Sequence, residues 1–540
     1  MNIYLCTEMS VTINALSYHH PNKEQLFTHL SFTVNKGDKA ALVGNNGVGK
    51  STLLQLIAGK LQPSAGEVIA SSALWYVPQH LGQYDHLSIA KALGVDKKLA
   101  AMQAITNGYT DVQYFTNLDD DWGIEDKIYA ALHQWQLSHL SPTQKIGALS
   151  GGEKTKVFLA GIEIHSPEII LLDEPSNHLD VAGRMQLYDL IIKSRATILA
   201  VSHDRTLLNL LPQTYELSPA GIEIYGGNFD FYLEQKEGKV NALQNQLHEQ
   251  SKTLKQTQQK ARDVAEKRQR IESRGKTQGQ SGSLPRIIAG GLKSKAEGST
   301  AKALDVQDEK LAGISENIKQ IRGQIQQYQV LKIDIGSSTL HQGKVLVDAA
   351  GITYSFDDKP LWEALTFQVR SGDRIHVRGY NGAGKTTLLK VITGVLAPVT
   401  GQINRAEFTY LYLDQDYTII NPSLNVFEQI QHYNSRNLQE HELKSLLIYS
   451  QFERHTWDNK CEVLSGGEKM KLALCCLAVS NHTPEMLILD EPTNNLDVKS
   501  LDVLTAAVKH FNGTLLVISH DEYFTSEIGI DKIIEVNRPQ

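Results

Sequence analysis

Two stretches of the sequence decide its fold: GNNGVGKST at residues 44–52 and GYNGAGKTT at residues 379–387. Glycines let such a loop bring its backbone N–H groups close to phosphate oxygens, and the N-terminus of a following helix favours negative charge. Each stretch stands between a short apolar segment and a run of helix-forming residues, which predicts the order strand, loop, helix. The strands are expected at Lys39–Val43 and Arg374–Val377, and the helices at Lys50–Ile57 and Lys385–Ile392. The pattern therefore predicts two loops that bind nucleotide phosphates.

Four further motifs follow each loop in the same order, so the sequence contains an internal duplication. The first copy has YVPQ at 76–79, LSGGEK at 149–154, IILLDEPSNHLD at 169–180 and VSHD at 201–204; the second has YLDQ at 412–415, LSGGEK at 464–469, LILDEPTNNLD at 487–497 and ISHD at 518–521. The loop lysine and the DE aspartate are 123 residues apart in the first copy and 105 in the second, and 30 residues separate that aspartate from the histidine in both. Apolar runs at Ile169–Leu172 and Leu487–Leu489 are expected to form buried parallel strands. The sequence thus predicts two α/β domains of one kind.

Length and composition fit a multidomain globular protein. The chain has 540 residues, 41% hydrophobic and 21% charged, which is close to the globular average for composition. No run of about 18 apolar residues is present, which excludes a self-contained membrane transporter. The N-terminus contains Glu8 and lacks the basic start and apolar core of a secretory signal. The four cysteines, Cys6, Cys461, Cys475 and Cys476, form no CxxC pair, which favours a reducing cytoplasm over a disulfide framework or a metal cluster.

The segment between the two domains, residues 236–330, follows a different pattern. Mostly apolar residues recur three and four positions apart in two runs, which predicts heptad seams on two helices. The seams are Val240, Leu243, Leu247, Gln250, Leu254, Thr257, Ala261 and Val264, and then Leu304, Gln307, Leu311, Ile314, Ile318, Ile321, Ile325 and Tyr328. Residues 275–299 are rich in Gly, Ser, Lys and Arg and contain Pro285, so they are expected to turn the chain back. The prediction is an antiparallel helical hairpin whose longer arm would extend about 45 Å, with a flexible linker as the alternative.

The repeated motifs carry residues suited to nucleotide hydrolysis. The loop lysine is expected to reach the β- and γ-phosphates, and the hydroxyl after it to bind Mg²⁺. The aspartate that ends the strand would hold the hydrated ion, the glutamate after it would polarise an attacking water, and the histidine would contact the γ-phosphate or orient the glutamate. In this order the residues are Lys50, Ser51, Asp173, Glu174 and His203 in the first copy, and Lys385, Thr386, Asp490, Glu491 and His520 in the second.

LSGGE beside a phosphate-binding loop resembles the signature of the ATP-binding cassette (ABC) ATPases, and the order of motifs resembles that family in both halves. The resemblance implies that the signature of one domain completes the nucleotide site of the other, which gives two composite sites in a head-to-tail sandwich. A serine hydroxyl and glycine N–H groups at a helix N-terminus suit the far side of a γ-phosphate. One site would join the loop 44–52 to Ser465, Gly466 and Gly467, and the other would join the loop 379–387 to Ser150, Gly151 and Gly152.

The same resemblance implies further roles. They are a glutamine that contacts Mg²⁺ and senses the attacking water, an aspartate that ends the D-loop, and a tyrosine that stacks on adenine or else belongs to the core. These residues are Gln79, Asp180 and Tyr18 in the first domain, and Gln415, Asp497 and Tyr354 in the second. Tyr380 and Asn495 replace a proline and a histidine that are more usual in the family, with little expected effect. In the loops the ATP-binding residues would be Gly44, Asn45, Asn46, Gly47, Val48, Gly49, Lys50, Ser51 and Thr52, with Gly379, Tyr380, Asn381, Gly382, Ala383, Gly384, Lys385, Thr386 and Thr387.

Two cassettes on one chain with a helical linker resemble the ABC-F family, the translation factors and ribosome-protection proteins that act in the ribosomal E site. EPSNHLD at 174–180 and YGGNFDFY at 225–232 also resemble local patterns of that family. The implied fold is α/β, with P-loop ABC ATPase domains at 1–235 and 331–540 joined by an antiparallel α-helical hairpin at 236–330. The implied function is that of a cytoplasmic, monomeric, Mg²⁺-dependent ATPase. It would bind the ribosome with ATP, direct the hairpin toward the P-site tRNA and the peptidyl-transferase centre, and leave after hydrolysis.

The distribution of charge agrees with an RNA partner, although the net charge of the chain is −7. Residues 236–330 contain 18 Lys and Arg against 10 Asp and Glu, a net charge of +8, which leaves −15 for the rest of the chain. Flexible cations bind RNA phosphates without much sequence readout, whereas a solvated helical face is the alternative for any single residue. The candidates for contact with rRNA or tRNA are Arg268, Arg270, Arg274, Lys276, Arg286, Lys293 and Lys295.

The two domains differ in length between the glutamine and the signature serine, which are 71 residues apart in the first and 50 apart in the second. The extra length is expected within residues 91–122. It resembles the short arm that ABC-F proteins insert there, but Asp119, Asp120 and Asp121 disfavour direct contact with rRNA, and a plain surface insertion is the alternative.

Two other classes of function compete with the ribosomal one. An ATP-hydrolysing subunit of an ABC transporter would share both cassettes but would leave the hairpin without an evident task. In DNA-repair and chromosome ATPases the coiled coil usually interrupts one cassette instead of joining two. The sequence leaves open the choice between housekeeping translation and antibiotic resistance, the tRNA state recognised, and the preference for ATP over GTP.

Overall fold

The computed structural model describes residues 9–20, 25–279, 309–325, 343–356, 359–380, 382–415, 417–481, 484–494 and 496–537. Contacts within the chain divide it into two compact units. The first unit comprises residues 1–229 and 331–540 and contains both α/β domains, and the second comprises Asp230–Val330. The second unit begins at Asp230, one residue after the start of the long helix that forms it.

The first domain is built on a six-stranded sheet in the order β5-β6-β7-β3-β8-β9, in which only β8 and β9 pair antiparallel. A three-stranded antiparallel sheet, β2-β1-β4, shares one hydrophobic core with the central sheet and α1. The strands are β1 Met9–His19, β2 Gln25–Asn35, β3 Lys39–Val43, β4 Ala65–Ala70, β5 Leu74–Val77, β6 Ile169–Asp173, β7 Thr197–Val201, β8 Gln213–Ser218 and β9 Gly221–Tyr225. The helices are α1 Lys50–Ile57, α2 Ile89–Ala92, α3 Asp96–Thr106, α4 Val112–Leu118, α5 Ile124–Gln134, α6 Gly151–His165, α7 Val181–Lys193 and α8 Arg205–Asn209, with 3-10 turns at Gly82–Tyr84 and Ile146–Ala148.

The second domain repeats this plan with a five-stranded parallel sheet, β16-β17-β18-β14-β19, and an antiparallel sheet, β13-β10-β15. Its strands are β10 Val345–Thr353, β11 Ser355–Phe356, β12 Lys359–Pro360, β13 Leu365–Arg370, β14 Arg374–Arg378, β15 Thr400–Arg405, β16 Tyr410–Leu413, β17 Met486–Asp490, β18 Thr514–Ile518 and β19 Lys532–Glu535. Its helices are α11 Lys385–Ile392, α12 Val426–His432, α13 Glu440–Tyr449, α14 Gly466–Val479, α15 Val498–His510 and α16 Glu522–Glu527, with 3-10 turns at Arg454–Thr456 and Cys461–Val463.

The strand, loop and helix predicted around each glycine-rich stretch are confirmed. β3, α1 and α11 have the predicted bounds, and β14 is one residue longer than expected. Every residue of β6 and β17 is buried, as expected for parallel strands with both faces covered. Since the carboxyl ends of parallel strands share one edge of the sheet, Asp173 and Asp490 are placed beside the loops.

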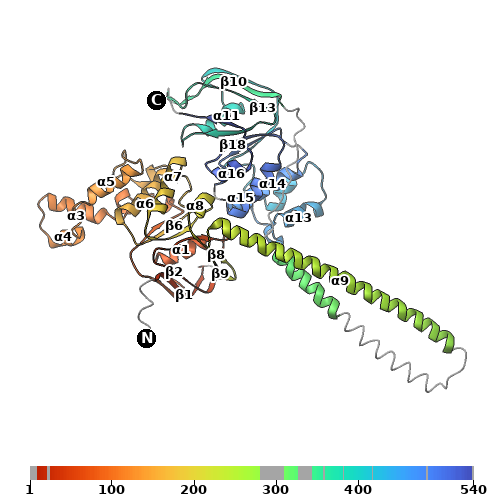
Figure 1. Cartoon of the computed structure of the whole chain (residues 1–540). Coiled ribbons are helices and arrows are strands. Elements are labelled where there is room, and N and C mark those ends of the chain that lie inside the picture. Colours follow the sequence, from red (N-terminus) through yellow and green to blue (C-terminus); the bar gives the residue numbers. More distant parts are fainter. Residues whose placement is uncertain are drawn as a thin grey trace, which may run out of the picture. The chain divides into compact units, whose positions relative to one another are not determined.

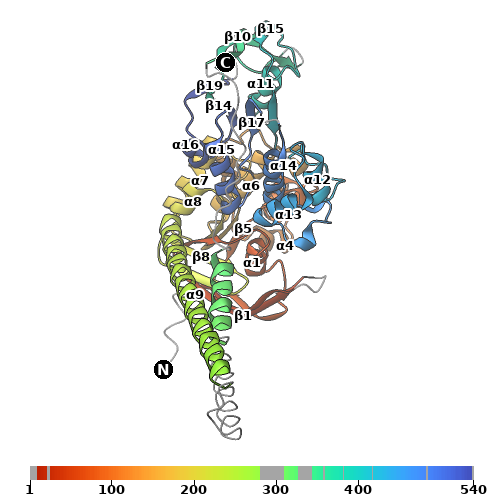
Figure 2. The same ribbon diagram turned by 90° about the vertical axis from the view of Figure 1, so that its right-hand side faces the viewer.

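The second unit contains α9, which spans Phe229–Gly279, and a second helical segment at residues 309–325 that lies beside it (Figures 1 and 2). The predicted seam of α9 is half-buried from Val240 to Ala261 whereas Val264 is exposed, and in the second segment Ile318 and Ile325 are buried. At 51 residues α9 extends about 75 Å, further than the predicted 45 Å, and it continues past Gly275 to Gly279. The rest of the predicted turn, and Leu304, Gln307 and Tyr328, lie outside the described residues.

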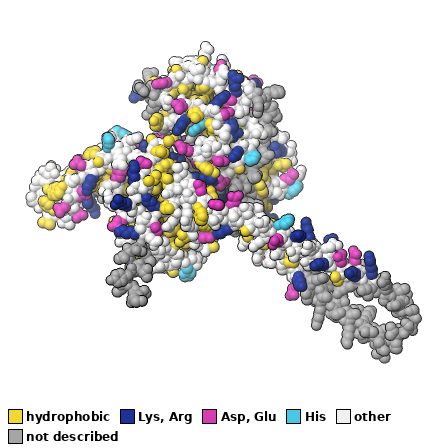
Figure 3. All heavy atoms as spheres, viewed as in Figure 1, with side chains coloured by type: hydrophobic (Ala, Val, Ile, Leu, Met, Phe, Trp, Pro, Cys, Tyr) yellow, Lys and Arg dark blue, Asp and Glu magenta, His cyan; other side chains and the backbone are white. Residues whose placement is uncertain are grey.

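The extra length in the first domain forms helices α3 and α4, within the predicted range 91–122. Asp121, one of the three aspartates of this stretch, pairs with Lys98 and Lys127 at 3.3 and 2.8 Å. Apolar side chains are exposed over these helices and the turns beside them (Figure 3). They are Tyr109, Val112, Phe115 and Trp122.

Candidate nucleotide-binding sites

Each glycine-rich loop closes around its own lysine. Lys50 Nζ donates hydrogen bonds to the carbonyl oxygens of Gly44 and Asn45 at 2.8 and 3.2 Å. Lys385 Nζ does the same with Gly379 at 2.7 Å. Burial lowers the pKa of both ammonium groups, while the acidic residues around them favour the charged form. Two buried cations thus stand where the sequence predicts phosphate binding.

Two glycines of the first loop allow a matched test of its shape. Both have left-handed backbones, with φ of +79° at Gly47 and +99° at Gly49, but only a Cβ at Gly49 would meet other atoms, at 2.6 Å from the Phe27 ring. Gly49→Ala is therefore expected to lower the free energy of unfolding by about 2–4 kcal/mol and Gly47→Ala by about 1–2 kcal/mol. Denaturant unfolding checks this. Equal losses in the two variants would contradict the close contact with Phe27.

A hydroxyl and a carboxylate meet at the end of the central strand in both domains. Ser51 Oγ donates to Asp173 Oδ1 at 2.9 Å, and Thr386 Oγ1 donates to Asp490 Oδ2 at 2.8 Å. Burial raises the pKa of Asp173, and the hydrogen bond from Ser51 opposes this shift. Hydroxyl and carboxylate oxygens are ligands that Mg²⁺ prefers, so the donor set present at each site fits that ion.

The glutamate that follows each aspartate is buried and faces the predicted histidine. Glu174 Oε1 lies 3.1 Å from His203 Nε2, and Glu491 Oε1 lies 3.3 Å from His520 Nε2. Both glutamates have left-handed backbones, with φ of 51° and 50°, a strained conformation that often occurs at functional sites. The same strained residue in both copies supports a shared functional role.

Burial controls the protonation of these pairs. It raises the pKa of Glu174 to about 8 and lowers the pKa of His203 and of His520 to about 3. Burial also raises the pKa of Glu491. Within the described residues, the buried atoms Glu174 Oε1, His203 Nδ1 and Glu491 Oε2 form no hydrogen bond. Such atoms suit a site that receives a polar ligand.

The signature motifs lie at helix N-termini. Ser150 and Ser465 are the N-caps of α6 and α14, and each forms a capping box with the glutamate three residues later. The motif glycines therefore occupy the first turn of a helix, where backbone N–H groups have no partner within the helix. This placement is the one that anion binding requires.

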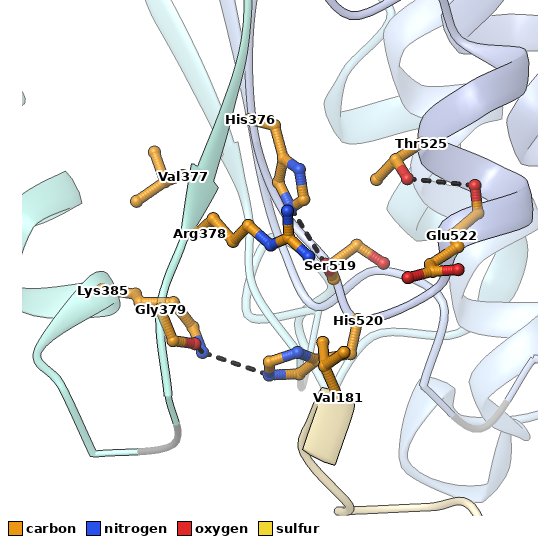
Figure 4. A pocket seen from close by; sticks show the side chains of 10 residues that line it. All are labelled: Val181, His376, Val377, Arg378, Gly379, Lys385, Ser519, His520, Glu522 and Thr525. Carbon is orange, nitrogen blue, oxygen red and sulfur yellow. Dashed lines mark hydrogen bonds between the residues drawn. The ribbon is translucent and has the colours of Figure 1, made fainter. Parts of the chain in front are cut away.

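Residues of both domains line the larger cavity, which has a volume of about 570 Å³. The first domain contributes the signature Ser150, Gly151 and Gly152 together with Lys156, His178, Asp180 and Arg184. The second contributes Gly382, Gln415, Glu491, Asn494 and His520. A smaller cavity of about 210 Å³ lies beside Lys385 and His520, whose Nζ and Nε2 atoms are 3.1 Å apart, and Val181 of the first domain also lines it (Figure 4).

The other predicted pairing also brings the domains together. The backbone N–H of Asn46 in the first loop donates to Asp497 Oδ2 at 3.4 Å, and a Cβ on the signature Gly467 would lie 3.9 Å from Asn46 Nδ2. Asp497 also caps α15 through the N–H of Ser500. Residues of the first loop thus lie near the signature and the D-loop of the second domain.

The remaining predicted site residues differ in placement. Tyr18 is buried in the core, with its ring edge-on to His20, whereas Tyr354 is half-buried and its ring stacks on Trp362. Neither lines the two cavities, and an adenine-stacking role stays a prediction that Tyr354 fits better. Gln79 and Gln415 lie two residues beyond the ends of β5 and β16. Five predicted residues lie outside the described part of the chain: Asn381, Asn495, Arg286, Lys293 and Lys295. The other candidates for RNA contact belong to α9, namely Arg268, Arg270, Arg274 and Lys276. Of these four side chains only that of Arg270 is described, and it is exposed.

Several residues at the sites were not singled out by the sequence analysis. Lys156 and Arg184 line the larger cavity, Arg205 joins the domains, and Tyr76 and Tyr412 contact the strand-end aspartates. For the tyrosines a signal exists, because each stands three residues before the predicted glutamine. No sequence signal marks Lys156, Arg184 or Arg205.

Comparisons with known proteins agree with this geometry. The chain matches the ABC transporter family over residues 27–177 and 362–494. It is 27% identical to ABC transporter F family member 5 of Arabidopsis thaliana, over 94% of this chain and 72% of that protein, and 29% identical to the ATP-binding protein Uup of Haemophilus influenzae, over 96% and 77%. The archaeal ribosome recycling factor aABCE1, solved in complex with the ribosomal stalk protein aP1, has the same fold, with a TM-score of 0.60 at 19% identity over 96% of this chain and 87% of that one. In the part of the chain that the structure describes, no helix has the length and apolar character needed to cross a membrane.

The chain belongs to the ABC transporter family and, within it, to the ABC-F proteins, with two domains that bind ATP.

Proposed function

We propose that the protein is a Mg²⁺-dependent ATPase with two composite sites. In each site the loop of one domain and the signature of the other would enclose one ATP. The observation that carries this proposal is the cavity lined by Ser150 and Gly151 on one side and by Glu491 and His520 on the other. Mg²⁺, held by the hydroxyl and carboxylate pairs described above, would neutralise phosphate charge.

The protein's own residues would then divide the work of hydrolysis. Lys385 would leave the loop carbonyls for the β- and γ-phosphates, where its buried charge gains a stronger partner. Glu491 would accept a proton from the attacking water, because its carboxylate is the buried base beside the γ-phosphate position. His520, kept neutral by burial, can donate one hydrogen bond and accept another. The first domain's Lys50, Glu174 and His203 would act in the same way.

We further propose that the ATP-bound protein binds the ribosome from the E site, in the cytoplasm and as a monomer. The hairpin would reach toward the P-site tRNA and the peptidyl-transferase centre, and hydrolysis would release the protein. The ABC-F relationship, the net charge of +8 on residues 236–330 and the helical structure of α9 support this proposal. The name of aABCE1, a ribosome recycling factor, agrees with it. The role would be either translation regulation or antibiotic resistance. Measuring the drug susceptibility of cells with and without the gene distinguishes the two.

Ribosome binding is tested with the double variant Glu174→Gln/Glu491→Gln. Given ATP, it is expected to co-sediment with ribosomes, whereas with ADP it should stay in the supernatant, because only ATP holds both sites closed. The control is the same variant without residues 240–328, which should bind ATP but not ribosomes. If the full-length variant binds ATP normally and never co-sediments, the ribosomal role is refuted. Association with membrane proteins instead would favour an ABC transporter subunit.

A further inference from the structure

In both domains a tyrosine hydroxyl donates a hydrogen bond to the carboxylate that ends the central strand. Tyr76 Oη donates to Asp173 Oδ2 at 3.1 Å, and Tyr412 Oη donates to Asp490 Oδ2 at 2.7 Å. Each tyrosine comes from the neighbouring parallel strand, β5 or β16. The same contact thus occurs twice in one chain, in domains that differ in much of their sequence.

The carboxylates that receive these bonds have little access to water. Asp173 is 1% exposed and Asp490 is 7% exposed. A buried carboxylate needs donors from the protein, and removing one leaves an unsatisfied charge. The other side-chain donors are the hydroxyls of Ser51 and Thr386, which are also the groups expected to bind Mg²⁺. If those hydroxyls bind Mg²⁺, the tyrosine would be the donor that still holds the carboxylate.

The surroundings hold each tyrosine in place. Tyr76 is buried in the core of the first domain with Lys60 Nζ 4.9 Å from its ring centre, and Tyr412 packs against the corresponding core of the second. A carboxylate oxygen can only accept, so the hydroxyl is the donor in both pairs.

We propose that Tyr76 and Tyr412 are positioning residues for the magnesium ion of the two ATP sites: each fixes the rotamer of the strand-end aspartate, so that its carboxylate faces the ion before nucleotide arrives. This inference rests on the proposed Mg²⁺-dependent ATPase. Hydrogen bonds to metal-binding carboxylates orient them, and losing such a bond typically weakens metal affinity about 10–100-fold. In this role each hydroxyl would act through the aspartate and not as a ligand of the metal.

The test is the double variant Tyr76→Phe/Tyr412→Phe, which removes two oxygen atoms and leaves both rings. Mn²⁺, a paramagnetic substitute for Mg²⁺, is titrated in the presence of ADP and followed by electron paramagnetic resonance, which reports metal binding without turnover. The Mn²⁺ dissociation constant is expected to rise at least about tenfold. In ATPase assays the Mg²⁺ concentration for half-maximal rate should rise in parallel, while the rate at saturating Mg²⁺ changes less than about threefold, since the positioning group is not part of the chemistry.

Tyr215→Phe is the matched control. This tyrosine lies in the same core as Tyr76, and its hydroxyl donates to Gln213 Oε1 at 3.1 Å, away from the strand-end aspartate. It should leave the Mn²⁺ affinity unchanged. An unchanged Mn²⁺ affinity in the double variant, or an equal loss in the control, would overturn the inference.

Two further measurements distinguish failure of the tyrosine role from misfolding of the variant and from failure of the proposed function. If the double variant unfolds, Tyr76→Phe in the Glu491→Gln background and Tyr412→Phe in the Glu174→Gln background report the two sites one at a time. If the unaltered protein binds ADP without any dependence on Mn²⁺ or Mg²⁺, the proposed metal-dependent function has failed, and not merely the role of the tyrosines.

Discussion

Replacing Glu174 and Glu491 together by glutamine is expected to lower ATP turnover by about 10²–10⁴-fold, the usual contribution of a general base. The amide has nearly the same shape as the carboxyl group but cannot accept the proton of the attacking water. Because burial raises the pKa of both glutamates, the neutral amide also suits the buried site, and folding should be preserved. Release of phosphate from saturating ATP measures the loss, and a nucleotide titration should show undiminished ATP binding.

The single variants separate the two sites. Glu174→Gln should leave the site built on Lys385 active, and Glu491→Gln the site built on Lys50, so each single variant is expected to retain a substantial part of the turnover. Glu163→Gln is a control, since Glu163 is a partly buried glutamate on α6 whose pKa burial also raises. Turnover that survives in the double variant would show that another group activates the water.

The sequence was a good guide to the parts of the fold that local chemistry determines. Lys39–Val43 and Lys50–Ile57 had to form a strand and a helix around the glycine-rich turn, and Ser150 was recognisable as part of a signature before its capping box was seen. The heptad pattern predicted which face of α9 is half-buried. These features depend on neighbours within a few residues, so their physical cause is visible in the sequence.

Features that depend on distant residues were not predictable. Gly275 suggested that the helix ended there, but a single glycine in a helix weakens it by only about 1 kcal/mol, and α9 continues to Gly279. Tyr18, whose position predicts either adenine stacking or a place in the core, is buried in the core beside Phe27 of β2. The burial of Tyr18 depends on how β1 and β2 pack in the tertiary structure, which no local pattern encodes.

Arg205 is the most important contact that the sequence does not predict. It opens α8 directly after His203 and Asp204, and its guanidinium donates to Asp502 of the second domain, 297 positions away in sequence. The guanidinium also lies over the ring of Tyr523 at 4.0 Å and 6.0 Å from the ring of Phe229, the first residue of α9. One side chain thus links the histidine loop of the first site, the second domain and the start of the hairpin helix.

Arg205→Ala is expected to weaken the association of the two domains by about 3 kcal/mol, the lower end of the range for a broken buried ion pair. The lower end applies because the Arg205 side chain is 6% exposed but that of Asp502 is 28% exposed. In the Glu174→Gln/Glu491→Gln background, which prevents hydrolysis, this loss should appear as an ATP affinity reduced about 100-fold. The reason is that ATP binds tightly only when loop and signature close on it together.

A double-mutant cycle with Asp502→Ala shows whether the ion pair is the cause. If the two residues act through each other, the double variant should lose little more ATP affinity than Arg205→Ala alone, which corresponds to a coupling of about 1–3 kcal/mol. Arg205→Lys keeps the charge but not the planar group over Tyr523, and should restore only part of the affinity. Fully additive losses, or a loss of folding in each isolated domain, would instead mean that Arg205 supports its own domain. If the losses of ATP affinity are instead coupled, the ion pair between Arg205 and Asp502 is the contact that links closure of the first site to the second domain.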